Sequence, residues 1–137
     1  MLHQCKLIST ITLVSAGRTL LVKYADMPDH QRGWFVPHVL MAALEHPTDA
    51  AVRAAREQAD ATIDSPELRN VESFKGRDGT WHLCFHHLAQ LPAPTPPPPS
   101  NIVTDAQWFD IDALPARDQV AHHGWAIDTI QTVMSRK

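Results

Sequence analysis

Two groups of residues in this sequence have side chains suited to chemistry. The first is the segment VRAAREQADA, residues 52–61, in which charged and amide side chains interrupt a run of alanines. The second is an abundance of histidine, nine in 137 residues. A carboxylate can hold a divalent cation or accept a proton, and an imidazole exchanges protons near neutral pH without any metal. Metal-assisted chemistry and metal-free proton transfer are therefore both open.

The element that carries the first group is expected to be a helix. Pro47 suits a first helical turn, and residues 50–62 are strong helix formers nearly throughout. Side chains three and four positions apart lie on one face of a helix. Ala54, Glu57 and Gln58 share such a face, so it presents a single carboxylate.

Short strands make up most of the remaining sequence. Runs rich in β-branched residues are separated by Gly, Pro and Asp turns, of which Asp78-Gly79 is a strong hairpin signal. We expect a sheet built mostly of meanders. The predicted elements are strands over residues 6–14, 18–24, 34–37 (extending toward 44), 68–74, 81–91 and 106–111, and helices over residues 50–62 and 119–134.

This order of elements resembles the Nudix hydrolase superfamily. The motifs that carry the resemblance are GRTLLVKY (residues 17–24), GWFVP (33–37) and D-x-x-WFDIDALP (105–115), and it extends from about residue 6 to residue 134. It implies an α+β fold, a Nudix-like α/β/α sandwich with a mixed, mostly antiparallel curved sheet, a Nudix-type helix and a C-terminal helix. The length suits a single domain over residues 1–137, with a proline-rich loop, residues 92–101, within it.

The signature box of that superfamily is matched only in part. Without a gap, Glu45 and Arg53 match its first Glu and its Arg, which in the family form a structural ion pair. The Glu that should follow the Arg is Ala54, and the Glu pair is Glu57-Gln58. In the family, these carboxylates hold divalent cations, usually Mg²⁺, against a diphosphate. We therefore expect no cofactor; if Mg²⁺ or Mn²⁺ binds, Glu57 and Glu45 are the expected ligands.

Histidine is the expected replacement for the missing carboxylates. Because side chains alternate along a strand, His82 and His86 share a face with Cys84, while His87 points the other way. A zinc site from His82 and His86 is not expected, since residues four apart on a strand lie too far from each other. The histidines that fall in or beside the elements lining the family's cleft are His38, His46, His82, His86 and His87.

The first functional hypothesis is metal-independent acid–base chemistry, such as cyclisation, isomerisation or hydrolysis, on a small, largely apolar metabolite. The expected catalytic residues are Glu57, His38 and His86, in which Glu57 pairs with one of the two histidines. Each histidine also has an ordinary interpretation as a half-buried, hydrogen-bonded strand residue, and the aromatic residues as core. The residues expected to bind substrate are Trp34, Gln58, Phe85 and His82.

Two other functions stay open. One is a Mg²⁺- or Mn²⁺-dependent hydrolase of a nucleoside diphosphate-type substrate, which would use Glu57, Glu45 and a further acidic residue. Asp60, Glu72 and Asp105 are the candidates for that residue. The other is a non-catalytic domain that binds a ligand or acts as a scaffold.

Composition narrows the class of partner. The formal net charge is −3, with Lys and Arg scattered, which gives no basis for binding nucleic acid or an anionic membrane. No apolar run approaches a membrane span, and the N-terminus lacks a signal-peptide pattern. Cys5 and Cys84 fall in predicted strands, which favours reduced thiols. We expect a cytoplasmic protein that acts on a small molecule, and homodimerisation stays open.

Overall fold

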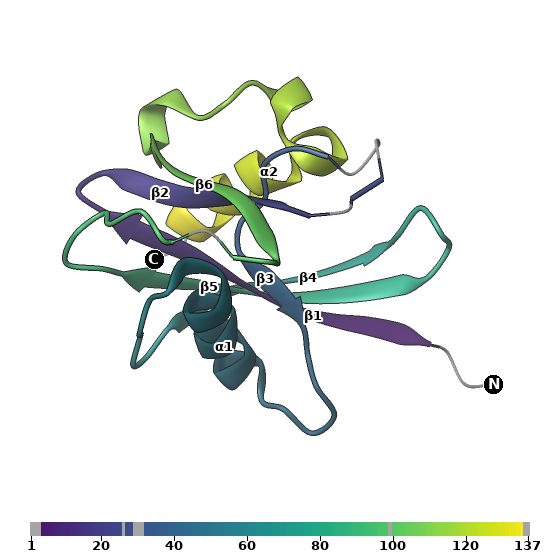
Figure 1. The fold of residues 1–137 in the computed structure, drawn as a ribbon. Coiled ribbons are helices and arrows are strands. Elements are labelled where there is room, and N and C mark those ends of the chain that lie inside the picture. Colours follow the sequence, from purple (N-terminus) through teal and green to yellow (C-terminus); the bar gives the residue numbers. More distant parts are fainter. Residues whose placement is uncertain (1–3, 26, 29–31, 99, 136–137) are drawn as a thin grey trace.

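The fold is built on one mixed sheet with helices packed against it (Figure 1). The computed structural model describes residues 4–25, 27–28, 32–98 and 100–135. This arrangement confirms the expected α+β class. The strands are β1 (Cys5–Ser15), β2 (Arg18–Tyr24), β3 (His38–Leu40), β4 (Glu67–Lys75), β5 (Trp81–Gln90) and β6 (Val103–Asp110). The helices are α1 (Pro47–Ala59) and α2 (Ala121–Ser135), with short 3₁₀ turns η2 (Ile111–Ala113) and η3 (Arg117–Gln119).

The centre of the sheet is a parallel pair of strands that are far apart in the sequence. The spatial order is β4-β5-β1-β2-β6, and β3 pairs with β1. β1 and β5 run parallel from the pair Cys5–Trp81 to the pair Val14–Gln90, while the other described strand pairs are antiparallel. The expectation of meanders holds for the hairpins β1–β2 and β4–β5. It is wrong at the centre, because turn signals carry no information about non-local pairing.

The strand expected to begin at Trp34 is shorter than predicted because the chain changes its partner there. Phe35 exchanges two backbone hydrogen bonds with Val22 of β2, at 2.8 and 2.9 Å. Two residues later, the Pro37 carbonyl accepts a bond from the Ile11 backbone N–H of β1 at 3.0 Å. Pro37 itself has no N–H to donate to a ladder. Regular pairing with β1 therefore covers only His38–Leu40.

Helix α1 begins and ends at identifiable residues. His46 caps it, since its Nδ1 accepts the Thr48 backbone N–H at 3.1 Å, and Pro47 occupies the first turn. The helix ends at Ala59, before the predicted residue 62, because Asp60 takes a left-handed conformation with φ 50°. Asp is among the few residues other than Gly that adopt this conformation readily. The side chains that α1 buries are those of Ala50, Ala51, Ala54, Ala55, Gln58 and Ala59.

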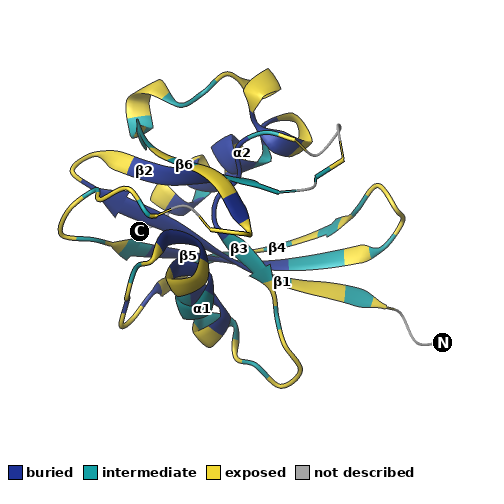
Figure 2. Ribbon diagram, in the orientation of Figure 1, coloured by how far each residue is buried: buried dark blue, intermediate teal, exposed yellow. Residues whose placement is uncertain are grey.

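Strand β2 is buried over its middle (Figure 2), and its alternate residues supply two separate hydrophobic clusters. Leu20 and Val22 pack in the cluster that contains the buried alanines of α1. Leu21 lies between them in sequence and packs with Ile127 and Ile130 of α2. Because adjacent side chains of a strand point to opposite faces, the two helices cover opposite sides of the sheet. The α/β/α layering is therefore as expected.

Helix α2 opens with an unusual turn. His122, His123 and Gly124 all have positive φ, at 54°, 58° and 96°. A left-handed conformation costs a non-glycine residue about 1–2 kcal/mol, so the surrounding contacts must hold this turn in place. The regular helical residues follow, beginning with Trp125. Among the described residues, no helix combines the length and the apolar character needed to cross a membrane.

Candidate functional site

Gln58 of α1 is used as a structural clip. Its Nε2 donates to the His38 carbonyl at 2.7 Å, and its Oε1 accepts from the His38 backbone N–H at 3.1 Å. The same Oε1 accepts from the Tyr24 hydroxyl at 2.5 Å. Both polar atoms of this buried amide are therefore occupied, and they tie α1 to β3 and β2.

The neighbouring carboxylates of the box face Arg53. The guanidinium binds Glu45 in a bidentate manner, with Nε–Oε2 and Nη2–Oε1 distances of 3.0 Å each. These hydrogen bonds lower the pKa of Glu45 to about 2. Arg53 also donates to the Leu40 carbonyl at 2.9 Å and to Glu57 Oε1 at 3.2 Å. Glu57 therefore lies against a fixed positive charge on the solvent side of α1.

The box positions do not fit the divalent cation that the superfamily uses. A hard cation such as Mg²⁺ needs several oxygen ligands, usually including more than one carboxylate. Ala54 offers no donor atom, and both polar atoms of Gln58 are taken by β2 and β3. Glu57 remains as a single carboxylate, and its Oε1 already accepts a hydrogen bond from Arg53. As arranged here, the residues at the box positions are a poor set of ligands for Mg²⁺.

The side chain of His38 is surrounded by aromatic rings. Its ring centroid is 5.1 Å from that of Tyr24, 5.2 Å from Phe35 and 5.6 Å from Trp125. Nδ1 lies 2.9 Å from the Val36 carbonyl, which only accepts, so Nδ1 carries the hydrogen. Loss of hydration lowers the pKa of His38 to about 4. The ring is neutral at pH 7, and its Nε2 is a hydrogen-bond acceptor.

His86 of β5 is held through both ring nitrogens. Nε2 lies 2.9 Å from Glu72 Oε1, and Nδ1 lies 2.8 Å from Thr10 Oγ1. Since a carboxylate accepts only, Nε2–H donates to Glu72. Trp125 Nε1–H donates to the same Glu72 oxygen at 3.3 Å. The bond from His86 lowers the pKa of Glu72, so this carboxyl group is ionised at neutral pH.

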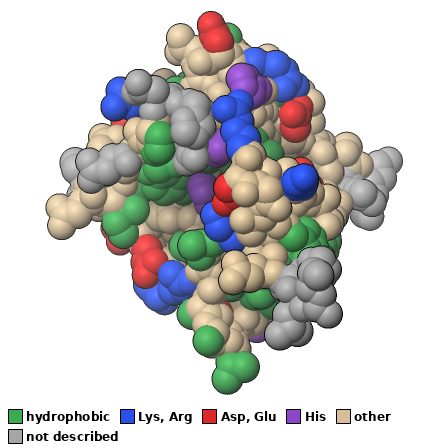
Figure 3. All heavy atoms as spheres, turned by 90° about the vertical axis from the view of Figure 1, so that its right-hand side faces the viewer, with side chains coloured by type: hydrophobic (Ala, Val, Ile, Leu, Met, Phe, Trp, Pro, Cys, Tyr) green, Lys and Arg blue, Asp and Glu red, His purple; other side chains and the backbone are tan. Residues whose placement is uncertain are grey.

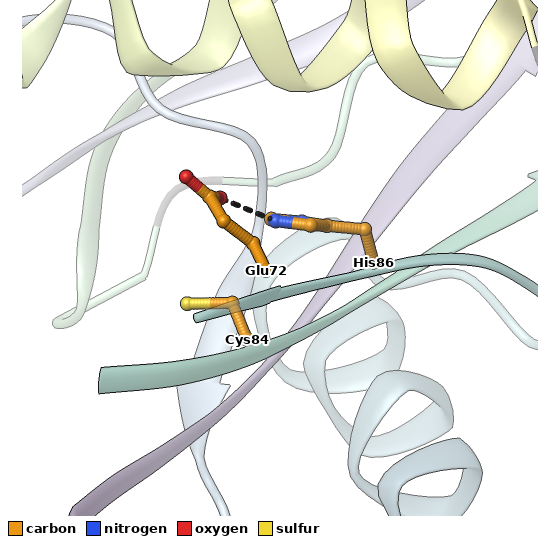
Figure 4. Close-up of side chains that lie close together, drawn as sticks. All are labelled: Glu72, Cys84 and His86. Atoms are coloured by element: carbon orange, nitrogen blue, oxygen red, sulfur yellow. Dashed lines mark hydrogen bonds and ion pairs between the residues drawn. The ribbon is translucent and has the colours of Figure 1, made fainter. Parts of the chain in front are cut away.

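Cys84 completes this cluster (Figure 4). It lies two residues before His86 on β5 and directly opposite Glu72 of β4 in the strand register. The thiol is not an activated nucleophile, because both nitrogens of His86 are bonded to other groups. Burial and then the charge of Glu72 raise the pKa of Cys84 to about 12, so the thiol is protonated.

Trp125 joins the two histidines that lie far apart in the sequence. Its ring centroid is 5.6 Å from that of His38 and 5.9 Å from that of His86. The left-handed turn before it is fixed by Arg117, whose Nη1 donates to the His123 carbonyl at 3.2 Å. On the face at the right-hand side of Figure 1, histidine side chains lie in the upper middle, next to Lys or Arg side chains and beside hydrophobic ones (Figure 3).

The structure brings together some of the expected catalytic residues and separates another. His38 and His86 meet around Trp125. Among the described contacts, none joins Glu57 to either histidine. The reason lies in the two sides of the sheet: Ser9 of β1 faces α1 and bonds to its Pro47 carbonyl, whereas the next residue, Thr10, faces the opposite side with His86.

The residues expected to bind substrate have other surroundings. Trp34 is buried against Phe109 at a centroid distance of 5.0 Å and belongs to the α2 cluster. His82 stacks on Phe74 at 5.1 Å and bonds to the Thr80 carbonyl at 2.8 Å. Phe85 neighbours His86 on β5 and therefore points to the opposite face. Of these four residues, Gln58 has described hydrogen bonds to the backbone of His38.

Sequence reasoning named Glu72 only as a helper for a metal and gave no role to Trp125 or Tyr24. A signal for Glu72 existed in the predicted hairpin. With the turn at Asp78-Gly79, the register that pairs Lys75 with Trp81 also places Glu72 opposite Cys84. No sequence signal indicated that Trp125 lies near His38 and His86. Its position depends on how α2 packs against the sheet and on the left-handed turn before it.

Comparison with solved structures finds proteins of similar fold. A MutT Nudix hydrolase from Burkholderia pseudomallei is 21% identical, with a TM-score of 0.78 over 96% of this chain and 99% of that chain. A Nudix hydrolase from Nitrosomonas europaea is 16% identical, with a TM-score of 0.79 over 96% and 90%. An Ap4A hydrolase from C. elegans is 17% identical, with a TM-score of 0.70 over 95% and 98%. At these identities the likeness is one of fold.

Comparison of the sequence itself is more decisive. No curated protein matches the chain. A family model described as the NUDIX domain matches residues 7–128, which is most of its length. The matched span includes the helix with Glu57 and Gln58 as well as the cluster around His86. On this match, the chain belongs to the Nudix family.

Proposed function

We propose that this Nudix-family chain performs metal-independent acid–base chemistry on a small, largely apolar molecule, with Glu72 and His86 as the proton-handling pair. The observation that carries the proposal is the 2.9 Å hydrogen bond from His86 Nε2 to Glu72 Oε1, beside Trp125. It supplies a base with an orienting partner, which is the arrangement that general acid–base catalysis needs. Glu72 takes the place that Glu57 held in the expectation from sequence.

One oxygen of Glu72 has no described hydrogen bond and can accept a proton. The hydrogen bonds from His86 and Trp125 both end on Oε1, and no described contact uses Oε2. The side chain is 38% exposed, so Oε2 can meet a molecule from solvent. His86 holds the carboxylate in its ionised form and in one orientation. A proton taken by Oε2 and returned to a second substrate atom gives isomerisation or cyclisation, and a proton taken from water gives hydrolysis.

The surroundings favour a neutral substrate. Trp125 contributes a half-buried aromatic ring with Phe35 packed in the core behind it, and His38 is uncharged at neutral pH because its hydration is lost. Sites lined by aromatic side chains with a few placed polar groups suit apolar ligands. A diphosphate would instead need the cations that a set of helix carboxylates holds, and α1 carries only Glu57 on that face.

Solvent deuterium provides a test that works while the substrate is still unidentified. The chelator-treated protein is incubated in heavy water with a library of small neutral carbonyl metabolites, and mass spectrometry detects exchanged or rearranged products. We expect incorporation by the wild-type protein and by Glu57→Gln. We expect Glu72→Gln to lose about 10²–10⁴-fold in rate, the usual contribution of a positioned general base.

Three outcomes would contradict this proposal. Equal activity in Glu72→Gln and the wild type would remove Glu72 from the reaction. Hydrolysis of nucleoside diphosphate derivatives that requires Mg²⁺ and Glu57 would establish the conventional hydrolase instead. A ligand that binds without any turnover would establish a binding domain.

A further inference from the structure

We propose that Glu72, Cys84 and His86 form a binding site for one borderline divalent cation of the Zn²⁺ class. The three side chains each offer one ligand atom, and these atoms lie within 4.8 Å of one another. A thiolate, an imidazole and a carboxylate are the three donor types that Zn²⁺ accepts, whereas Mg²⁺ prefers oxygen alone. This site lies on the sheet, and it shares no residue with the box helix α1.

The strands place the three donors before any metal arrives. Cys84 and His86 are two residues apart on β5, so they point to the same face. Glu72 is the register partner of Cys84 on β4. β5 is itself fixed by its parallel pairing with β1. Donors on rigid, paired strands need only small side-chain movements to converge, and this favours binding.

Two neighbouring side chains form hydrogen bonds to the proposed ligands, as is usual for metal-binding histidines and carboxylates. Thr10 Oγ1 lies 2.8 Å from His86 Nδ1 and can accept its N–H when Nε2 turns to the cation. Trp125 Nε1 donates to Glu72 Oε1 at 3.3 Å, which leaves the second carboxylate oxygen for the cation. Both contacts fix the orientation of a ligand.

Charge and access are also consistent with a cation here. Cys84 and His86 are buried, at 0% and 1% exposure, while the Glu72 side chain is 38% exposed and opens the cluster to solvent. A dication balances one thiolate and one carboxylate, so the occupied site is neutral with a neutral imidazole. Three protein ligands leave a fourth position for water or a small ligand.

This inference stands apart from the proposed function, because it concerns the affinity of the apo protein for a metal. Its consequence for that function is inhibition, since a cation would take the atoms of Glu72 and His86 that handle the proton. The deuterium assay with chelator tests the reaction, and metal titration without substrate tests the site. The failure of one therefore leaves the other intact.

Cobalt titration gives the direct test. Reduced, chelator-treated protein is titrated with Co²⁺, which replaces Zn²⁺ in such sites and absorbs light. We expect one equivalent to produce a thiolate-to-cobalt charge-transfer band and intense visible bands typical of four-coordinate Co²⁺, and Zn²⁺ to abolish both. Glu72→Gln should weaken binding by at least tenfold, and Thr10→Val by about 10–100-fold as an outer partner of His86.

Cysteine variants identify the ligand. Cys84→Ser should lose the charge-transfer band, while Cys5→Ser, which changes the other thiol of the chain, should keep it. Circular dichroism checks that each variant is folded, and Glu72→Gln provides a second ligand variant at a partly exposed position. No cobalt bands at one equivalent, or bands that vanish in Cys5→Ser and persist in Cys84→Ser, would overturn the proposal.

Discussion

At the scale of single residues, one position on a helix face can serve either as a metal ligand or as a hydrogen-bonding group that stabilises the fold. Gln58 takes the position of a box carboxylate, and its amide joins α1 to the His38 backbone and the Tyr24 hydroxyl. An amide can donate and accept at once, which a carboxylate cannot do. The substitution therefore exchanges a metal ligand for a structural bond.

Gln58→Glu is expected to destabilise the protein rather than restore a metal site. The new oxygen would face the His38 carbonyl, 2.7 Å from the present Nε2, and would leave that carbonyl without its donor. We expect a loss of about 1–3 kcal/mol in the free energy of unfolding, measured by urea denaturation. Glu57→Gln, at the adjacent exposed position, should change it by no more than about 0.5 kcal/mol. A Gln58→Glu protein of wild-type stability that binds Mg²⁺ tightly would contradict this interpretation.

At the scale of elements, two local structural features position the site. One is the pair Glu45–Arg53, which fixes the connection between β3 and α1. The other is the left-handed turn over His122, His123 and Gly124, which leads into Trp125. The first follows from a motif, so sequence could suggest it. The second could not be predicted, because only Gly124 of the three residues favours positive φ.

Loss of the Glu45–Arg53 ion pair should lower the free energy of unfolding. Glu45→Gln removes the charge that binds Arg53 in a bidentate manner and that also accepts the Ala42 backbone N–H at 2.9 Å. Hydrogen bonds to charged groups contribute about 1.5–3 kcal/mol, and we expect a loss in this range by urea denaturation at pH 7. The difference should shrink as the pH falls from about 4.5 toward 2, where Glu45 becomes protonated in the wild type. A loss that stays constant over this range would rule out the charged pair as its cause.

The turn before Trp125 can be tested with a matched pair of glycine variants. A Cβ at Gly124 would lie 2.6 Å from Arg117 Nη1 and 3.0 Å from its Cγ, while one at Gly17 would meet nothing within 4 Å. Both have positive φ, 96° and 74°, so each Gly→Ala change carries a backbone cost of about 1–2 kcal/mol. We expect Gly124→Ala to lose more stability than Gly17→Ala and also to alter the near-ultraviolet circular dichroism of tryptophan. Equal losses with unchanged spectra would show that the turn does not position Trp125.

At the scale of the whole molecule, sequence predicted what is local. Both hairpins, α1 and α2 follow from turn residues, capping residues and helix formers close to one another in the chain. The parallel pairing of β1 with β5 joins residues more than seventy positions apart, and no local pattern specifies it. Glu57 was expected beside His38 or His86 for the same reason: the sequence did not show that Glu57 and these two rings lie on opposite sides of the sheet.

Global stability should fall in mildly acidic solution. His38 has a pKa of about 4 in the folded protein, below its ordinary value of 6.5, and burial also lowers the pKa of His87. Below pH 6.5 the unfolded chain binds protons at these histidines that the folded chain does not bind. The stability that they contribute is therefore fully present above pH 6.5 and decreases as the pH falls toward 4. Each histidine contributes a slope of at most about 1.4 kcal/mol per pH unit. Urea denaturation across this range should show a flatter dependence for His38→Gln, and an unchanged slope would contradict the assignment.

We propose that the chemistry of this Nudix-family chain resides in Glu72 and His86 on the sheet and not in the box helix. The most direct test is calorimetric titration of chelator-treated protein with Mg²⁺ and Mn²⁺, repeated with Glu57→Gln. We expect no binding that depends on Glu57 at physiological cation concentrations, because Arg53 and the Gln58 clip occupy that face. Binding of Mg²⁺ by the wild type that is lost in Glu57→Gln would contradict the claim and return the metal to the helix.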